Sequence, residues 1–381
     1  MSWPIIQQLN LHRDRLDADI RADWVTVKAA WEGVAPYSDL EDLALRWDLQ
    51  YRSNLPEQAR AAGQAAVHPR LPGALLLLSP ILIIPTSVLF ELWFAFNLLL
   101  LLVLLWGCSR GGGEARARLL LLAPIALFTT PVQWTLAWST QSLLVAVLVL
   151  YCWRLSGRWS GTLTGVPLGI AGTLKVFPLV AIVPLVRSHR ERVAGGALGA
   201  MVLLSAVGAA VLGVSVREAL GAIASAGSTW LPLEGNASLA SLFHRTGMSS
   251  TLASLTGGGL GLVAVAWLLR RKLPEEETYF GSILAGLLAS PLSWIHYDVV
   301  LIPLAARLWD RRHLSGVRFG LTIWVVFDML SWVLASWTPI PIGMWALAGR
   351  LGLLWVVVRT GSAGHEQADD DRVPSSFAQA A

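Results

Sequence analysis

Long apolar segments separated by short polar loops dominate the chain from residue 71 to about residue 358. A helix needs about 20 apolar residues to cross a bilayer, and several of these segments are long enough. The apolar segments at 119–130 and 163–184 are short or contain proline. We expect broken helices there, which membranes tolerate where protein encloses the freed backbone. The pattern predicts an all-α integral membrane protein, a polytopic helical bundle with about eight to ten crossings.

The two ends of the chain differ from this central region. Residues 1–70 are polar, are rich in Asp, Arg and Ala, and contain no apolar run long enough to span a bilayer. We expect an N-terminal helical loop module there, on the extracytoplasmic side. The polar sequence at 359–381 is typical of a disordered cytoplasmic tail. One multi-spanning transmembrane domain, at 71–358, is therefore predicted between the N-terminal module and the tail.

Arginine is concentrated in five short loops between the apolar segments. These loops lie at 108–118, 154–158, 187–192, 270–272 and 307–318. Basic residues in short loops favour the cytoplasmic side of a membrane, so the five loops mark the cytoplasmic face of the bundle. Between successive loops the chain must cross out and back. The intervening apices are therefore predicted to meet on the extracytoplasmic face.

The composition fits a lipid environment. Hydrophobic residues make up 55% of the sequence and charged residues only 14%, which is typical of a polytopic membrane protein. The 19 tryptophans agree with this interpretation, because Trp collects at membrane interfaces. The net charge of +4 is small, and the basic residues act as topology signals. We therefore expect membrane lipids as partners and no nucleic acid.

Polar and ionisable residues stand out at the predicted extracytoplasmic apices. At bilayer depth an ionisable residue costs roughly 2.5–3.5 kcal/mol, so it is uncommon unless it faces a cavity, a partner or a substrate path. Lys175 lies beside a break in an apolar segment, where a lysine either snorkels to the interface or meets an anion such as a phosphate. The other apices carry Gln141, then Asn236 with Arg245, and then Trp294, His296, Tyr297 and Asp298.

Two aspartates, Asp19 and Asp23, precede a probable helix in the N-terminal module. An aspartate at the start of a helix is most often only a cap. The alternative is a carboxylate above the membrane surface that acts as a general base, a role worth roughly 10²–10⁴ in rate when the geometry is right. The residues alone leave both interpretations open. The sequence has no zinc-ligand spacing, no G-x-S-x-G motif and no phosphate-binding loop, so we expect neither a metal nor a cofactor.

A series of short segments runs along the chain in a recognisable order. They are an aspartate with an Ala-rich helix and a G-x-x-P-Y turn ending at Tyr37, then HPRLPGALLLLSP, STQSLL, LKVFP, NASLASLFHR and SPLSWIHYD. Each segment is weak alone, but their order, spacing and shared side of the membrane are specific. Over residues 17–358 the chain resembles glycosyltransferase family 87, within the multi-spanning GT-C superfamily. The resemblance implies a GT-C-like helical bundle.

The resemblance also implies an activity. Such proteins take a polyprenyl-phosphate sugar, typically polyprenyl-phosphate mannose, and transfer the hexose to a lipid or glycan acceptor on the extracytoplasmic face of the cell membrane. Transfer would be inverting and independent of metal. An N-terminal aspartate would deprotonate the acceptor hydroxyl. The spacing to the turn at Gly33 favours Asp19 as this base, whereas the Asp-Trp context favours Asp23.

The remaining site residues follow from the same resemblance. Those expected to hold the leaving polyprenyl phosphate are Lys175, His296, Arg245 and Gln141. Those expected to contact the substrates are Tyr37, Asn236, Trp294 and Tyr297. A positioned cation would stabilise the negative charge that develops on the phosphate in the transition state.

Two alternatives remain open at this level. The first is a transporter or flippase for lipid-linked sugars, which would need polar groups along a path through the bilayer. The second is a degenerate relative that binds lipid phosphate without turnover. His68 and Pro69 stand where family members have a tyrosine-proline stretch, and Thr140 stands where they usually have glycine. These departures bear on activity more than on fold.

Overall fold

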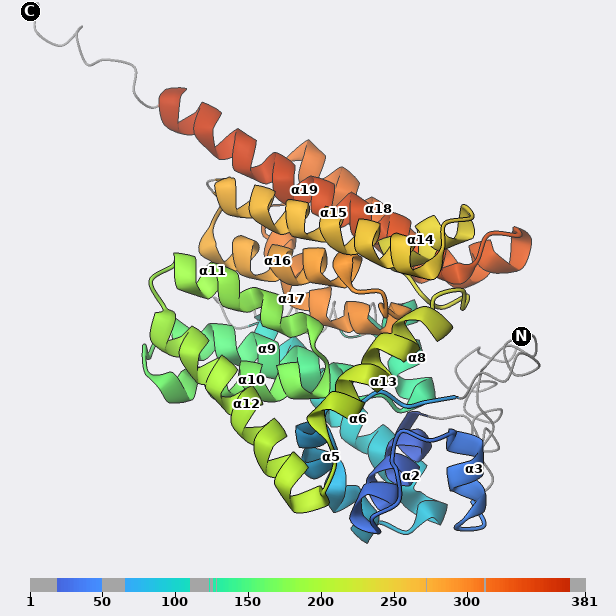
Figure 1. The fold of residues 1–381 in the computed structure, drawn as a ribbon. Helices are drawn as coiled ribbons and strands as arrows, with labels where there is room; N and C mark the ends of the chain where they lie inside the picture. Colours follow the sequence, from blue (N-terminus) through green and yellow to red (C-terminus); the bar gives the residue numbers. More distant parts are fainter. Residues whose placement is uncertain are drawn as a thin grey trace, which may run out of the picture.

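The computed structural model describes residues 19–49, 66–109, 123, 126–127, 129–271, 273–311 and 313–370, without the side chains of 328–330, 332–333 and 360–370. The described ranges form helices joined by short connections (Figure 1). Within them, backbone pairing of the β type is limited to an isolated bridge between Asn236 and Trp294. The predicted all-α architecture is therefore confirmed.

The N-terminal module contains helices α2 (Asp19–Trp31) and α3 (Leu40–Leu45). Gly33 follows α2 with a φ of +69°, a conformation that glycine adopts without steric cost. One side of α2 buries Ile20 and Val27 in the main core of the bundle, so the module is docked onto it. The opposite side of α2 packs against α3. As a result, the first turn of α2 is held against the membrane-embedded part of the protein.

Apolar helices make up the rest of the structure. In chain order the first group is α5 (Pro72–Leu78), η1 (Ser79–Ile83), α6 (Thr86–Ser109), α8 (Thr130–Trp138), α9 (Ser142–Ser156), η2 (Thr162–Gly165), α10 (Val166–Leu174), η3 (Phe177–Ala181), α11 (Ile182–Arg187) and α12 (Glu191–Leu212). The second group is α13 (Val216–Thr229), α14 (Leu239–Arg245), α15 (Ser250–Arg270), α16 (Glu275–Ala289), η4 (Ile295–Leu301), α17 (Ile302–Trp309), α18 (Ser315–Trp337) and α19 (Ile342–Asp370).

Within the described ranges, four helices are long and apolar enough to cross a membrane. They are α6, α12, α15 and the Ile342–Arg359 part of α19. The pair α8 and α9 adds a fifth span if it is counted as one, although it bends by 119°. The expected eight to ten crossings also counted the other apolar segments, several of which form shorter helices. These shorter helices are Pro72–Ile83, Thr162–Leu174, Phe177–Arg187 and Ser315–Phe327. The protein is a polytopic membrane protein.

The broken helix expected at 163–184 is present. Helix α10 ends at Leu174, Lys175 takes an extended backbone conformation, and η3 begins two residues later with Pro178 in its first turn. Most of the segment 119–130, where a second short helix was expected, lies outside the described residues. Helix α19 continues to Asp370, so the expected tail at 359–381 begins as helix, and residues 371–381 lie outside the described part. The sequence from 360 to 370 contains no proline, which permits this extension.

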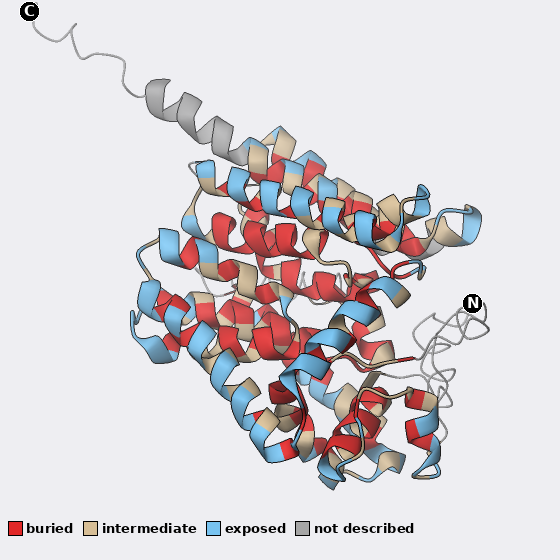
Figure 2. Ribbon diagram, viewed as in Figure 1, coloured by how far each residue is buried: buried red, intermediate tan, exposed pale blue. Residues whose placement is uncertain are grey.

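Small residues allow the helices to approach closely. A Cβ atom on Gly165 would lie 1.9 Å from the Val193 carbonyl oxygen of α12, and one on Gly208 would lie 2.4 Å from the Pro72 carbonyl oxygen of α5. Such glycine contacts are how membrane helices gain packing energy without a hydrophobic driving force. Figure 2 shows the outcome: α16 is mostly buried, whereas α12 and α15 expose one face.

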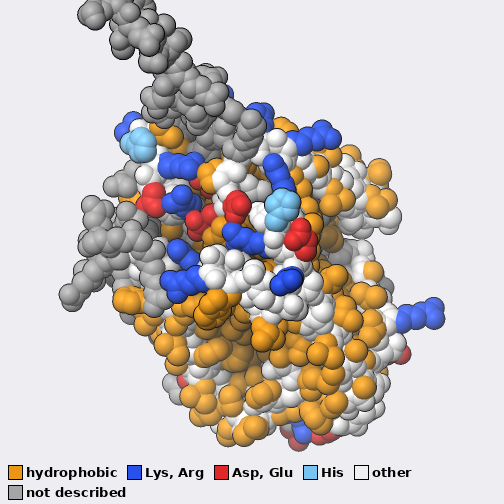
Figure 3. Space-filling model, turned by 90° about the vertical axis from the view of Figure 1, so that its left-hand side faces the viewer, with side chains coloured by type: hydrophobic (Ala, Val, Ile, Leu, Met, Phe, Trp, Pro, Cys, Tyr) orange, Lys and Arg blue, Asp and Glu red, His pale blue; other side chains and the backbone are white. Residues whose placement is uncertain are grey.

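The two ends of the bundle differ in chemistry. At one end, the first turn of α16 pairs with arginines of the predicted cytoplasmic loops: Arg190 Nη2 lies 2.6 Å from Glu275 Oε2, and Arg311 Nη1 lies 2.9 Å from Glu277 Oε1. Figure 3 views this end and shows charged side chains gathered beside a hydrophobic surface. The polar residues singled out from the sequence lie instead around the loops at the opposite end, where α9 begins and α16 ends.

Candidate active site

A fully buried carboxylate, that of Asp23 on α2, is the centre of one polar cluster. His68 Nε2 and Arg70 Nε each lie 2.8 Å from Asp23 Oδ1, and Gln141 Nε2 donates to Oδ2. Arg70 Nη2 also donates to Gln141 Oε1 at 2.9 Å. Gln141 reaches this position because it begins α9, directly after the bend, where Ser139 takes a left-handed conformation. Three side chains from two distant parts of the sequence therefore satisfy a single carboxylate.

The charge state of this cluster follows from its contacts. Burial alone would raise the pKa of Asp23, but the charges of Arg70 and His68 and their hydrogen bonds outweigh burial and hold this pKa well below its usual range. Burial, helped by Arg70, lowers the pKa of His68 despite the opposing charge of Asp23. At neutral pH the imidazole is therefore neutral, and because ionised Asp23 only accepts, His68 donates through Nε2. Asp23 is therefore ionised, and both of its carboxylate oxygens accept hydrogen bonds.

Asp19 stands one helical turn before Asp23 and has a different environment. Its side chain is half-buried, and none of the described residues donates a hydrogen bond to its carboxylate. Its charge nevertheless acts on Arg70, His68 and Lys175, which places it within electrostatic reach of the cluster. Asp19 thus presents free carboxylate oxygens beside a group of cations, whereas Asp23 does not.

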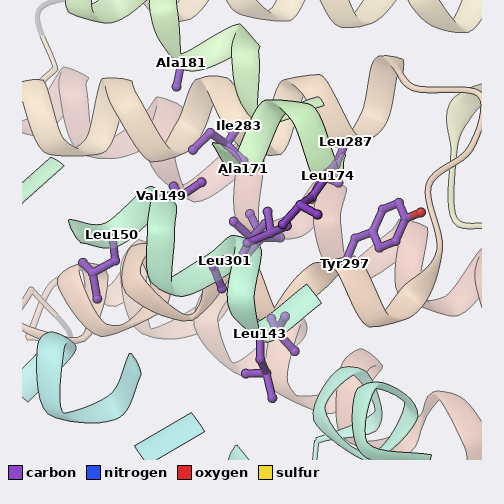
Figure 4. Close-up of a cluster of buried hydrophobic side chains, with 14 of the residues drawn as sticks. Leu143, Val149, Leu150, Ala171, Leu174, Ala181, Ile283, Leu287, Tyr297 and Leu301 are labelled. Atoms are coloured by element: carbon purple, nitrogen blue, oxygen red, sulfur yellow. The ribbon is translucent and has the colours of Figure 1, made fainter. Parts of the chain in front are cut away.

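A second polar group surrounds Lys175, at the break between α10 and η3. Lys175 Nζ donates to Tyr297 Oη at 2.9 Å, and the Tyr297 ring stacks on Phe177. Figure 4 places Tyr297 at the edge of a buried apolar cluster that includes Leu174 and Leu301. Lys175 is therefore held in place by a side chain of this buried apolar cluster. An ammonium group has three N–H bonds, so two remain for a ligand after the tyrosine takes one.

His296 is buried next to this group, and neither of its ring nitrogens has a hydrogen-bond partner among the described residues. It stacks parallel to Trp294 and meets the Tyr297 ring edge to face. The charges of Lys175 and Arg70 act on it, so both polar clusters adjoin it. An unpaired buried polar group costs about 1–3 kcal/mol. This cost is recovered if a ligand or water pairs with the imidazole, which makes His296 a candidate binding residue.

Arg350 on α19 is a residue that the sequence interpretation missed. It is fully buried, and its Nε donates to Asp298 Oδ1 at 2.7 Å. Its other nitrogens donate to the Ala237 carbonyl at 2.7 Å, Ser293 Oγ at 2.6 Å and the Trp294 carbonyl at 2.9 Å. One guanidinium therefore holds together the NAS loop and the segment that carries His296. A charge inside the apolar run WALAGRLGLLW was the available signal.

The remaining predicted residues contact the loops and side chains that surround the site. Asn236 donates to the Pro291 carbonyl at 2.8 Å and accepts from the Ser238 backbone N–H at 3.2 Å, so its amide braces a loop. Arg245 Nη2 donates to the carbonyls of Pro232 and Leu233 at 2.7 and 3.0 Å. The described contacts of Arg245 do not join it to Lys175 or His296. Gln141 binds Asp23 and Arg70, and Tyr37 Oη donates to the Arg70 carbonyl at 2.7 Å.

Comparison with known proteins places the chain in a family. The model of glycosyltransferase family 87 matches residues 71–293, more than half of the sequence. No match was found among curated proteins or among solved structures. The matched range contains Gln141 and Lys175 and ends at Ser293, so Asp19 and His296 lie outside it. The chain belongs to glycosyltransferase family 87 and is a membrane glycosyltransferase.

Proposed function

We propose that this glycosyltransferase transfers a hexose, mannose in the first instance, from a polyprenyl-phosphate donor to a lipid or glycan acceptor on the extracytoplasmic face of the cell membrane. One observation carries the proposal. The free carboxylate of Asp19 adjoins a cationic group in which Lys175 has spare donors and His296 has two unpaired nitrogens. Inverting transfer from a lipid phosphate requires a general base and, close to it, groups that bind the phosphate anion.

Asp19 is the base in this proposal, and Asp23 positions the cations. Asp23 accepts hydrogen bonds from three side chains and is held ionised by Arg70, so removing its negative charge by protonation is unfavourable. A base must accept a proton during the reaction. Asp19 has free oxygens for this purpose, on the same side of α2 one turn earlier.

The chemical step is a single displacement. Asp19 takes the proton of an acceptor hydroxyl as that oxygen bonds to C1 of the sugar. The bond between C1 and the phosphate oxygen breaks, and the electron pair leaves with the polyprenyl phosphate. Lys175 and His296 stabilise the charge that grows on the departing phosphate, which is the contribution expected of preorganised donors. Tyr297 keeps the lysine in place through its hydroxyl.

The membrane side is inferred from the positions of charge. Arg190 and Arg311 of the predicted cytoplasmic loops pair with the first turn of α16, whereas Tyr297, the partner of Lys175, follows the other end of α16. Because basic loops favour the cytoplasm, the site belongs to the extracytoplasmic face. The donor would then enter with its isoprenoid chain in the bilayer and its phosphate beside Lys175.

The test is transfer of radiolabelled mannose from synthetic polyprenyl-phosphate mannose into total lipid extract, by membranes that contain the protein. We expect Asp19→Asn to abolish transfer while the thermal stability of the purified protein stays within about 1 °C of the wild type. Asp23→Asn should instead lower both activity and stability, since it removes a buried anion from Arg70. Wild-type turnover by Asp19→Asn would refute the assignment. Exchange of the donor between leaflets without transfer would support the transporter alternative.

A further inference from the structure

A cavity of about 380 Å³ lies between the N-terminal module and α13, outside the groups described above. Its volume falls within the range of roughly 300–1,000 Å³ that is usual for small-molecule sites. Tyr37 and Ser38 line it from the module, and Glu218, Gly221 and Ser225 line it from α13. The cavity is therefore a groove between two elements that are far apart in the sequence.

The lining has the chemistry of a carbohydrate site. Tyr37 offers an aromatic ring, whose face packs on the C–H groups of a sugar. The carboxylate of Glu218 and the hydroxyls of Ser38 and Ser225 have no hydrogen-bond partner among the described residues. They are the acceptors and donors that sugar hydroxyls need. Ala35, Val67 and Ala222 supply the apolar part of the lining, and a metal ion would require more than one carboxylate.

The cavity is joined to the candidate active site through one short segment. Val67 lines the cavity, and the next residue, His68, binds Asp23. Tyr37 donates to the carbonyl of Arg70, the other cation on Asp23. Successive Cα atoms are 3.8 Å apart, and Asp19 stands one turn of about 5.4 Å from Asp23. A ligand of a few sugar units in this groove therefore lies beside the segment 67–70, which contacts Asp23 on the helix that carries the base.

We propose that this groove is a binding site for the saccharide part of the acceptor, held by Tyr37, Ser38, Glu218 and Ser225. The identification of the ligand as the acceptor rests on the proposed function. The saccharide-binding chemistry of the groove does not depend on it. It selects a glycan-bearing acceptor over one that presents only lipid, because its contacts are made to hydroxyl groups.

Gly221 provides a direct way to fill the groove. A Cβ atom built on Gly221 has nothing within 4 Å, so we expect Gly221→Leu to place its side chain in the cavity, and it replaces a poor helix former. Gly199, which is exposed on α12, also has nothing within 4 Å of an added Cβ, and Gly199→Leu is the matched control. Glu218→Gln tests the carboxylate at almost constant volume.

Binding is measured without turnover, by saturation-transfer NMR of methyl mannobioside and methyl glucobioside with the protein in nanodiscs. We expect the wild type and Gly199→Leu to bind at least one disaccharide and Gly221→Leu to lose it. Glu218→Gln should weaken binding about tenfold, as expected for the loss of a charged hydrogen bond. Unchanged binding by Gly221→Leu, or no binding of either disaccharide by the wild type, would overturn the proposal.

The transfer assay separates this inference from the proposed function. Gly221→Leu should raise the KM for a glycan acceptor at least tenfold while hydrolysis of the donor by water continues at the wild-type rate. If disaccharides bind the groove but no transfer occurs, the proposed function fails and the saccharide site stands. If transfer occurs with an acceptor KM that Gly221→Leu does not change, the groove is not an acceptor site.

Discussion

Breaking the buried pair of Arg350 and Asp298 should uncouple the two loops that frame the site. In Arg350→Met, the buried Asp298 loses its counter-ion, and three further oxygens lose their donor. Removing one partner of a buried ion pair costs about 3–5 kcal/mol. With an unfolding entropy of about 2.1 cal/mol/K per residue over the whole chain, the midpoint should fall by about 4 °C or more. Membrane helices that persist on unfolding reduce this entropy and enlarge the shift.

A double-variant cycle isolates the pair from the loss of packing. Arg350→Met with Asp298→Leu replaces both charges by apolar side chains, a change that is often neutral or stabilising in buried pairs. The double variant should therefore be more stable than Arg350→Met alone, with a coupling of about 2 kcal/mol or more. Arg350→Lys keeps the charge but not the fork of donors, so it should recover only part of the loss.

The assay is thermal unfolding of purified protein in nanodiscs, followed by tryptophan fluorescence, together with the KM for the polyprenyl-phosphate donor. Because Arg350 holds the segment that carries His296, the donor KM should rise in Arg350→Met and fall back in Arg350→Lys. The reasoning is refuted if Arg350→Met melts and binds donor like the wild type. It is also refuted if the two single changes add to within about 0.5 kcal/mol of the double change.

Three further changes test other parts of the structure. Lys175→Ala should lower kcat/KM by about 10²–10³, since it removes a donor from the leaving phosphate, while insertion and purification are unchanged; Lys175→Arg serves as the charge-conserving comparison in the transfer assay. Because the pKa of Asp23 is lowered in the folded protein, its contribution to stability is present above its ordinary value of 3.8 and is lost as the pH falls below it, so the stability gap between the wild type and Asp23→Asn should narrow from pH 6 to pH 3 in unfolding measurements. Gly208→Leu should prevent assembly or lower the melting temperature sharply, because its side chain meets the Pro72 backbone of α5, whereas Gly199→Leu should not; equal melting temperatures would contradict the packing.

Hydropathy and motif spacing predicted the membrane bundle, the break at Lys175 and the family. These features are local, because apolar length and proline placement act within one segment. The sequence also indicated that Gln141, Lys175 and His296 belong to one face. Their proximity follows from chain topology, which charge in the loops reports.

The sequence could not predict which side chains contact one another, because these contacts join residues far apart in the chain. Asp23 is satisfied by His68, Arg70 and Gln141, and the spacing of the two aspartates carried no sign of these contacts. The choice between Asp19 and Asp23 as the base therefore became arguable only with the contacts in view. The resemblance implied Arg245 as a phosphate ligand, and in the structure its Nη2 donates to two carbonyls of the preceding loop. The type of a residue does not reveal which neighbour it meets.

The bend of 119° between α8 and α9 makes the site sensitive to changes that a hydropathy profile does not register. Gln141 reaches Asp23 because it stands at the corner, as the first residue before α9. Each residue inserted into a helix turns everything beyond it by about 100°. An added alanine within α8 would keep the segment apolar and membrane-inserted while rotating the corner away from α2. Among family members, insertions or deletions near this bend should therefore indicate lost activity more reliably than changes in apolar content do.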